Sequence, residues 1–166
     1  MYQNLTGSIL KNKSLKRASF KDFAAVLMAR LMHKFKPKDK NITILVATSG
    51  DTGSAIGEAH KNIKGVKVYI LYPKSEVSSI QKKQLDSIGG SVQAIAVDGK
   101  FDDCQKLVKE AFSDPDLADL NLTSANSINI GRILPQIPYY FYAYINIVNG
   151  FEPVVFSIPS GNFGNS

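Results

Sequence analysis

The segment 48–53 (TSGDTG) combines hydroxyls, a carboxylate and two glycines directly after the apolar run 42–47. Glycines let the backbone approach a bound group closely, and a helix beginning near residue 54 would aim its free amides at an anion. This composition favours a carboxylate or phosphate site. The same residue types are also preferred helix N-caps, so a tight turn that only caps a helix is an equally open interpretation.

Two further stretches have compositions suited to anions. Residues 159–165 (PSGNFGN) combine small residues, hydrogen-bond donors and two glycines after the apolar run 154–158. A phosphate-binding loop at this position would need a helix after it, whose N-terminal amides point at the anion. Residues 122–132 (LTSANSINIGR) place small polar side chains before Arg132, a residue suited to bidentate contact with phosphate or carboxylate. The alternative is a polar loop that satisfies its own backbone, with Arg132 on the surface.

Lys21 lies between two aromatic residues in the segment 19–23 (SFKDF). Shielding from water would make this amine a better nucleophile, able to form a Schiff base. Most single lysines are surface residues, and the residue by itself does not decide between these interpretations.

The elements that must position these segments alternate between strands and helices. Apolar runs predict strands at 42–47, 66–71, 92–97 and 154–158. Helical spacing predicts helices at 24–35, 54–62, 78–88, 101–112 and 131–147, the last of them buried. Strands joined by helices form parallel sheets covered on both faces, so we predict an α/β fold with three layers. Ligands of such sheets bind beyond the carboxyl ends of the strands.

Composition indicates one globular domain with a single charged end. The chain has 166 residues, 44% of them hydrophobic, which is enough to bury a core. Residues 1–40 carry ten Lys/Arg and two Asp/Glu, a net +8, whereas the remainder carries ten and twelve, a net −2. No aromatic residues interleave the basic residues of 11–17, so a nucleic-acid surface is not indicated.

Cys104 is the single cysteine of the chain, which predicts a reducing compartment and excludes a cysteine-based zinc site. No apolar run reaches the roughly 18 residues that a membrane span needs, and the N-terminus lacks the apolar region of a signal peptide. We therefore expect a cytoplasmic protein with no metal and no membrane or nucleic-acid partner. The oligomeric state is not readable from the sequence.

Taken in order, six segments resemble the threonine synthase family. They are SFKDF, LVATSGDTGSA, YILYPKSEVSSIQKKQL with GG after it, VDGKFDDCQ, SANSINIGRILPQ and PSGNFGN, and they span about Ser19 to Asn165. Each segment alone is a weak signal, whereas the complete set in this order is a strong one. The resemblance implies the tryptophan-synthase-like fold, fold type II among pyridoxal-phosphate enzymes.

The resemblance also implies roles for individual residues. Lys21 matches the lysine that holds pyridoxal 5′-phosphate covalently. Ser49, Asp51 and Thr52 belong to the loop that grips the α-carboxylate of the substrate. Asn126, Ser127 and Arg132 match positions that hold the phosphate of the substrate. The loop for the phosphate of the cofactor corresponds to Ser160, Gly161, Asn162, Phe163 and Gly164.

The implied reaction converts O-phospho-L-homoserine and water to L-threonine and phosphate. In such a reaction the cofactor stabilises carbanions, Lys21 shuttles protons, and Arg132 stabilises the departing phosphate. A threonine or serine dehydratase of the same fold is the enzymatic alternative, although its substrates carry no phosphate for Arg132 to hold.

The chain departs from the family at both ends. Residues 14–18 stand where the family has a Gly-Pro-Thr turn, and the family's N-terminal region and everything after the phosphate loop are absent. We interpret residues 1–18 as an unmatched basic segment and 19–166 as a partial cofactor-binding domain. We expect this chain alone to bind the cofactor weakly with little or no synthase activity, so a truncated, non-catalytic relative is the second hypothesis.

Overall fold

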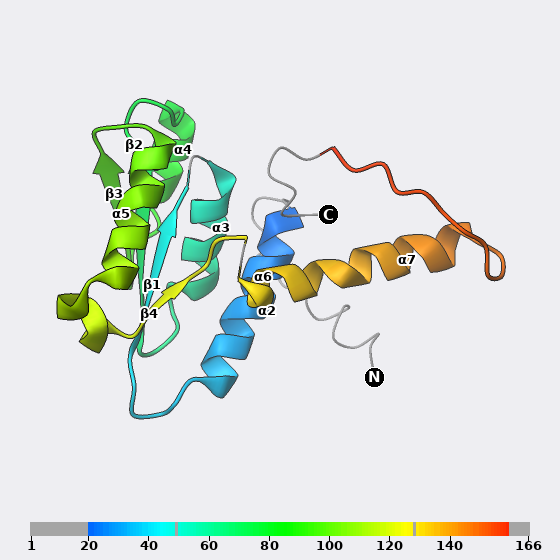
Figure 1. Ribbon diagram of the computed structural model, residues 1–166, viewed down its shortest axis with the longest axis horizontal. Helices are drawn as coiled ribbons and strands as arrows, with labels where there is room; N and C mark the ends of the chain where they lie inside the picture. Colours follow the sequence, from blue (N-terminus) through cyan, green and yellow to red (C-terminus); the bar gives the residue numbers. More distant parts are fainter. Residues whose placement is uncertain (1–19, 49, 128, 160–166) are drawn as a thin grey trace.

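The computed structural model describes residues 20–159 apart from 49 and 128, drawn as coloured ribbon in Figure 1. Along the chain the described elements are α2 (Phe20–Phe35), β1 (Ile42–Ala47), α3 (Asp51–His60), β2 (Val66–Pro73), α4 (Ser79–Asp86), β3 (Val92–Val97), α5 (Phe101–Ser113), the 3-10 helix η1 (Pro115–Leu120), β4 (Leu122–Ser124), α6 (Ile130–Ile133), the 3-10 helix η2 (Leu134–Gln136) and α7 (Ile137–Ile147). None of the described helices is long and apolar enough to span a membrane.

The strands form one parallel sheet in the order β3-β2-β1-β4. Successive residues of a strand point to opposite faces, and β1 has apolar side chains on both. Ile44 and Val46 enter a core shared with α2, α3 and α4, whereas Leu45 and Ala47 pack on the opposite face with α5. The predicted α/β fold with three layers is therefore confirmed.

The loops that follow β1 and β4 lie at one rim of the sheet because these strands are parallel neighbours. Leu45 of β1 lies opposite Ser124, the last residue of β4. Helix α3 starts directly after β1, and both α2 and α3 begin at the end toward which the strand arrows point (Figure 1). Lys21, on the first turn of α2, thus lies on the same side of the molecule as the two loops.

Gly53 lets the first turn of α3 lie directly on the sheet. A Cβ atom at this position would lie 2.5 Å from Cγ2 of Thr48 and 2.8 Å from Cγ2 of Ile70, both on stiff β-branched side chains. At Gly57, one turn later, the tightest contact is 2.6 Å to Cδ1 of Ile88, the flexible end of its side chain.

We therefore expect Gly53→Ala to destabilise the chain by about 1–3 kcal/mol. The higher helix propensity of alanine relative to glycine would stabilise the folded chain by about 1 kcal/mol, which is too little to offset overpacking against two fixed methyl groups. Urea unfolding of Gly53→Ala beside Gly57→Ala, where Ile88 can rotate away, measures the difference. A Gly53→Ala chain as stable as the wild type would contradict this account of the contact.

The strand predicted at 154–158 is wrong. The segment forms no strand, and Val155 is 97% exposed. In Figure 1 it runs along α7, away from the sheet. A strand requires hydrogen-bonding partners on a neighbouring strand, and none of the described strands lies beside it.

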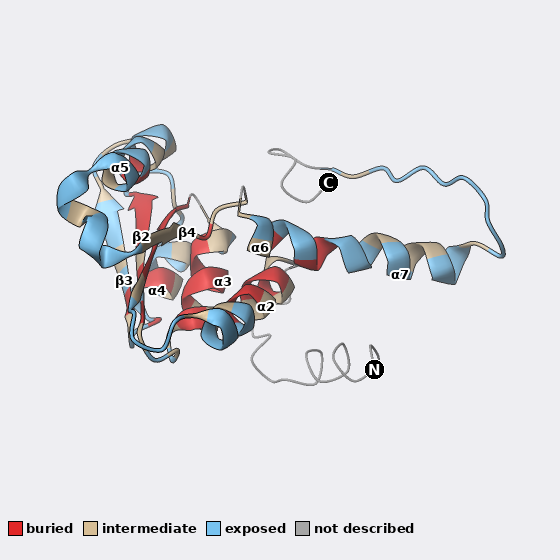
Figure 2. Ribbon diagram, turned by 60° about the horizontal axis from the view of Figure 1, so that its bottom comes forward, coloured by how far each residue is buried: buried red, intermediate tan, exposed pale blue. Residues whose placement is uncertain are grey.

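The single buried helix predicted at 131–147 is also wrong. The stretch divides into α6, η2 and α7, and Pro135 and Pro138 each lie at the first or second position of a new helix, where the missing amide is tolerated. Helix α7 has no buried residue, and Figure 2 draws it almost entirely as exposed or intermediate. Its described ring contacts are Phe23 with Tyr139 and Tyr140 with Phe156.

Other boundaries differ by a few residues. Helix α2 begins at Phe20 rather than residue 24, and α3 covers 51–60 rather than 54–62. The sequence prediction missed β4 and η1, because β4 is only three residues long and two of them are polar. Without β4 the position of the loop that follows it could not be predicted.

Candidate functional site

Thr48 organises the turn between β1 and α3. Its buried hydroxyl accepts hydrogen bonds from the amides of Gly50, at 3.1 Å, and Gly53, at 3.2 Å, and donates to the carbonyl of Gly50 at 3.0 Å. A helix start leaves several amides without a helical partner. Thr48 satisfies two of those here, and no acceptor among the described residues bonds the amides of Asp51 and Thr52. These two amides are the donors that the turn can offer to an anion.

The structure bears on the cap interpretation of this turn, and the anion site stays a prediction. A side chain caps the turn, as the cap interpretation requires, but the residue responsible is Thr48, which the sequence reasoning did not single out. Asp51 is exposed and Thr52 half-buried, so a ligand can reach the start of α3. Ser49 lies outside the described residues, as does the predicted cofactor-phosphate loop at 160–164.

Two side chains hold the loop after β4 in shape. Asn129 donates to the carbonyl of Ser124 at 2.6 Å and accepts from the amide of Gly131 at 2.8 Å, which caps α6. The hydroxyl of Ser124 accepts from the amide of Asn126 at 3.1 Å. Asn126 and Ser127 are half-buried, and Oδ1 of Asn126 has no partner within the described part of the chain. An unsatisfied buried acceptor is costly, and a ligand donor would relieve it.

Arg132 is buried, not on the surface as the alternative interpretation would have it. It is 5% exposed, and Nη1 donates to the carbonyl of Ala125 at 2.8 Å. Its Nε is buried without a partner in the described part of the chain, and burial lowers the pKa of the guanidinium. Between residues 20 and 159, the two gaps aside, no carboxylate pairs with it. A buried cation without a described ion-pair partner is costly, so this position favours a bound anion.

His60, at the end of α3, is fully buried near Arg132. Its Nδ1 donates to the carbonyl of Ile56 at 2.8 Å, which leaves Nε2 as a buried acceptor without a partner in the described residues. Burial, with a smaller contribution from the Arg132 charge, lowers the pKa of His60 from 6.5 to about 4, although the bond to Ile56 opposes this. The folded chain therefore holds a neutral imidazole at neutral pH.

Acidification from pH 7 to pH 5 is expected to cost about 2 kcal/mol of stability through His60. The unfolded chain takes up a proton near pH 6.5 and the folded chain only near 4, so the stability present above 6.5 is lost as the pH falls between these values. Urea unfolding at both pH values measures the loss. His60→Gln should lower the dependence, and His33→Gln, at an exposed position, is the matched control. Equal losses in wild type and His60→Gln would refute this assignment.

Lys21 is half-buried on the first turn of α2. Its neighbour Asp22 is buried, and the ring of Phe23 lies 5.5 Å from that of Tyr139. Burial, followed by the charge of Asp22, raises the pKa of Tyr139. The start of α2, which carries the lysine, is therefore held by the burial of Asp22 and by the ring contact of Phe23.

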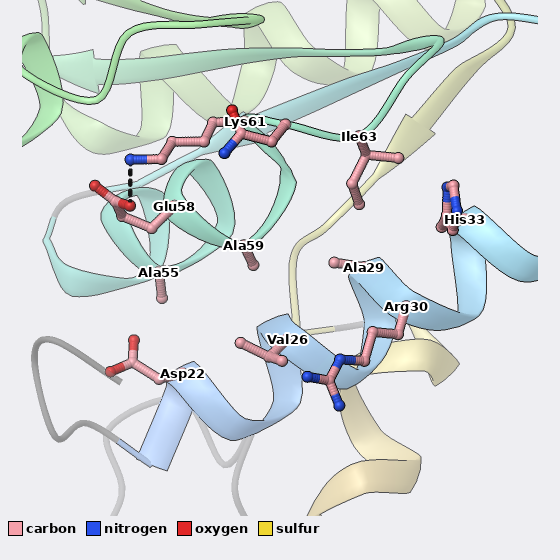
Figure 3. A pocket seen from close by; sticks show the side chains of 11 residues that line it. Asp22, Val26, Ala29, Arg30, His33, Ala55, Glu58, Ala59, Lys61 and Ile63 are labelled. Atoms are coloured by element: carbon pink, nitrogen blue, oxygen red, sulfur yellow. Dashed lines mark ion pairs between the residues drawn. The ribbon is translucent and has the colours of Figure 1, made fainter. Parts of the chain in front are cut away.

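A cavity of about 440 Å³ lies between α2 and α3, on their flank rather than at the rim. Figure 3 shows side chains of both charges around it, including Asp22, Arg30 and the pair Glu58 and Lys61, whose Oε2 and Nζ atoms are 2.8 Å apart. None of the predicted site residues lines this cavity. It is not the anion site that the loops predict.

Comparison with known proteins places the chain among cofactor-dependent enzymes. The profile of a family described as pyridoxal-phosphate dependent enzyme matches residues 8–164. The threonine synthase of Escherichia coli strain K12 is 48% identical over 149 residues, which cover 89% of this chain and 35% of that protein. The chain thus spans about a third of the length of such relatives.

Solved structures agree in fold. The crystal structure of threonine synthase from Escherichia coli matches with a TM-score of 0.77 and 47% identity, over 89% of this chain and 35% of that one. A structure described as PLP-bound threonine synthase from Brucella melitensis matches with a TM-score of 0.77 and 43% identity, over 89% and 32%.

Proposed function

Because this chain belongs to the pyridoxal-phosphate dependent enzymes, we propose that it carries the cofactor lysine and the substrate-binding loops of a threonine synthase. The proposed reaction converts O-phospho-L-homoserine and water to L-threonine and phosphate. That substrate has two anionic groups, a carboxylate and a phosphate. The similarity to threonine synthases over most of the chain supports the choice of substrate.

The observation that carries the proposal is a pair of anion-accepting positions after two adjacent parallel strands. One is the start of α3, where the amides of Asp51 and Thr52 have no acceptor in the described residues. The other is Arg132, a buried cation without a described carboxylate partner. Two such positions suit a doubly anionic substrate better than a simple amino acid.

The functional groups on the described part of the site fit the cofactor and the substrate. The primary amine of Lys21 provides a nucleophile, and the open amides can donate to a carboxylate. The amide oxygen of Asn126, which has no described partner, can accept from an amino or hydroxyl group. When bound, pyridoxal phosphate would act as an electron sink that stabilises carbanions. Lys21 would hold it and carry protons, the amides of Asp51 and Thr52 would orient the carboxylate, and Arg132 would bind the phosphate.

The test is where the cofactor attaches on the purified chain. Pyridoxal phosphate is added, the adduct is fixed with borohydride, and peptides are mapped by mass spectrometry. The sequence has seventeen lysines, so non-selective labelling would scatter over all of them. We expect labelling concentrated at Lys21, with O-phospho-L-homoserine reducing it more strongly than L-homoserine does. Scattered labelling would refute the proposal for the lysine, and equal effects of the two ligands would refute the phosphate site.

A cytoplasmic location belongs to the same proposal. The single cysteine in the sequence suits a reducing compartment, and biosynthesis of a small amino acid takes place where its soluble precursors are.

A further inference from the structure

Gln81, in the first turn of α4, uses only one end of its side-chain amide for structure. Its Oε1 accepts from the amide of Ser78 at 3.0 Å, and the hydroxyl of Ser78 accepts from the amide of Gln81 at 3.2 Å, which completes a capping box. The backbone donor at Ser78 fixes which end of the amide is oxygen. The Nε2 group is therefore the end that points elsewhere, and no acceptor among the described residues bonds it.

That Nε2 group lies against the turn at the start of α3. A Cβ atom built on Gly50 would be 3.1 Å from it, which is tighter than nine in ten real contacts of this kind. Gly50 is the N-cap of α3, and the two open amides, those of Asp51 and Thr52, follow it directly. The glycine thus lets a side-chain donor of one helix approach the start of another.

We propose that Gln81 is a further substrate-binding residue, which donates from Nε2 to the carboxylate bound at the start of α3. This inference rests on the proposed function, because that function places the α-carboxylate there. A carboxylate has acceptor sites for more than two donors, and the turn offers two amides. The amide of Gln81 supplies a third donor from a different helix, so it would select ligands that carry a carboxylate.

The capping box allows the functional role to be separated from the structural one. Gln81→Glu keeps an oxygen for the amide of Ser78, and glutamate is itself a preferred residue of the capping box. It removes the Nε2 donor and places a negative charge beside the anion. The variant should therefore fold with the stability of the wild type while it binds the carboxylate less well.

The matched control is Gln84→Glu. Gln84 lies on the same helix, is half-buried like Gln81, and its side chain makes no described hydrogen bond. The Gln84→Glu substitution adds the same negative charge to α4 without removing the proposed donor. Any general electrostatic effect of a new carboxylate on α4 will therefore appear in both variants.

The experiment titrates the cofactor-loaded chain with L-threonine and with L-threoninol, which lacks the carboxylate. Nuclear magnetic resonance follows the side-chain amide of Gln81, and urea unfolding reports the stability of each variant. We expect L-threonine, but not L-threoninol, to shift the Gln81 signal. Gln81→Glu should weaken L-threonine binding about tenfold or more, with L-threoninol binding unchanged, because a hydrogen bond to a charged group is lost.

Each outcome bears on one claim. Equal losses of L-threonine affinity in Gln81→Glu and Gln84→Glu, or no loss in either, would overturn the role of Gln81. If labelling at Lys21 occurs and the wild type still prefers L-threonine to L-threoninol, the proposed function survives that result. If Lys21 is not labelled at all, the proposed function fails and the inference falls with it.

Discussion

Replacing Lys21 with alanine is expected to abolish the borohydride-reducible adduct at residues 20–35 of the chain. The lysine lies on the first turn of α2, and Figure 1 shows that α2 and α3 begin on the same side of the molecule. Alanine has the highest helix propensity, so α2 should form unchanged. Binding of the cofactor through its phosphate and ring alone would remain, and borohydride cannot fix it. The expected loss is therefore of the covalent product, to the background seen at other lysines.

Two measurements isolate this effect. The visible absorption of the cofactor is recorded before reduction, and the labelled peptides are quantified after it. Lys34→Ala is the matched control, because Lys34 lies on the same helix but is exposed. Lys34→Ala should keep the Lys21 adduct at the wild-type level. An unchanged absorption band in Lys21→Ala would mean that another amine holds the cofactor.

The part of the fold that could be predicted consists of the elements whose own sequence pattern indicates burial. β1 and most of β2 are buried in a parallel sheet, and such strands are nearly continuous apolar runs in the sequence. β3 is also an apolar run, although it forms the more exposed edge of the sheet. Their helices have clear apolar stripes, such as Cys104 and Val108 on α5, which pack beside Leu45. The three layers could be derived from these patterns alone.

The wrong predictions share one physical cause. Helix α7 and residues 151–156 are apolar, and an apolar pattern indicates a preference for burial without identifying what covers the segment. Phe151 and Val155 are almost fully exposed in the structure. The hydrophobic pattern therefore predicted a helix near the right place but gave the wrong environment for it.

The sequence indicates candidate segments for the site but not the contacts within them. The composition of 48–53 indicated an anion site, yet the role of Thr48 depends on a hydroxyl that reaches back to two amides. Gln81 is 31 residues from Gly50 in the sequence, and only the packing of α4 beside α3 brings them together. Spacing patterns are local, so neither contact could be predicted from them.

Replacing Arg132 with methionine is expected to abolish phosphate binding while it leaves the chain as stable as the wild type, or more stable by about 1–2 kcal/mol. The variant loses the bond from Nη1 to the carbonyl of Ala125, which costs about 1–3 kcal/mol. It also removes a buried cation that has no described carboxylate partner, a desolvation penalty of several kcal/mol. The second effect should equal or exceed the first, because methionine fills much of the same volume.

Inorganic phosphate separates this account from a purely structural one. Phosphate at about 100 times its dissociation constant should stabilise the wild type by about 2.7 kcal/mol and should not stabilise Arg132→Met. The variant should also lose less stability between pH 7 and pH 5, since the Arg132 charge is one of the causes that lower the pKa of His60. Arg132→Lys keeps the charge without the fork of donors and should bind phosphate with intermediate affinity. A strongly destabilised Arg132→Met chain, or one that phosphate still stabilises, would show that the guanidinium serves the fold rather than a ligand.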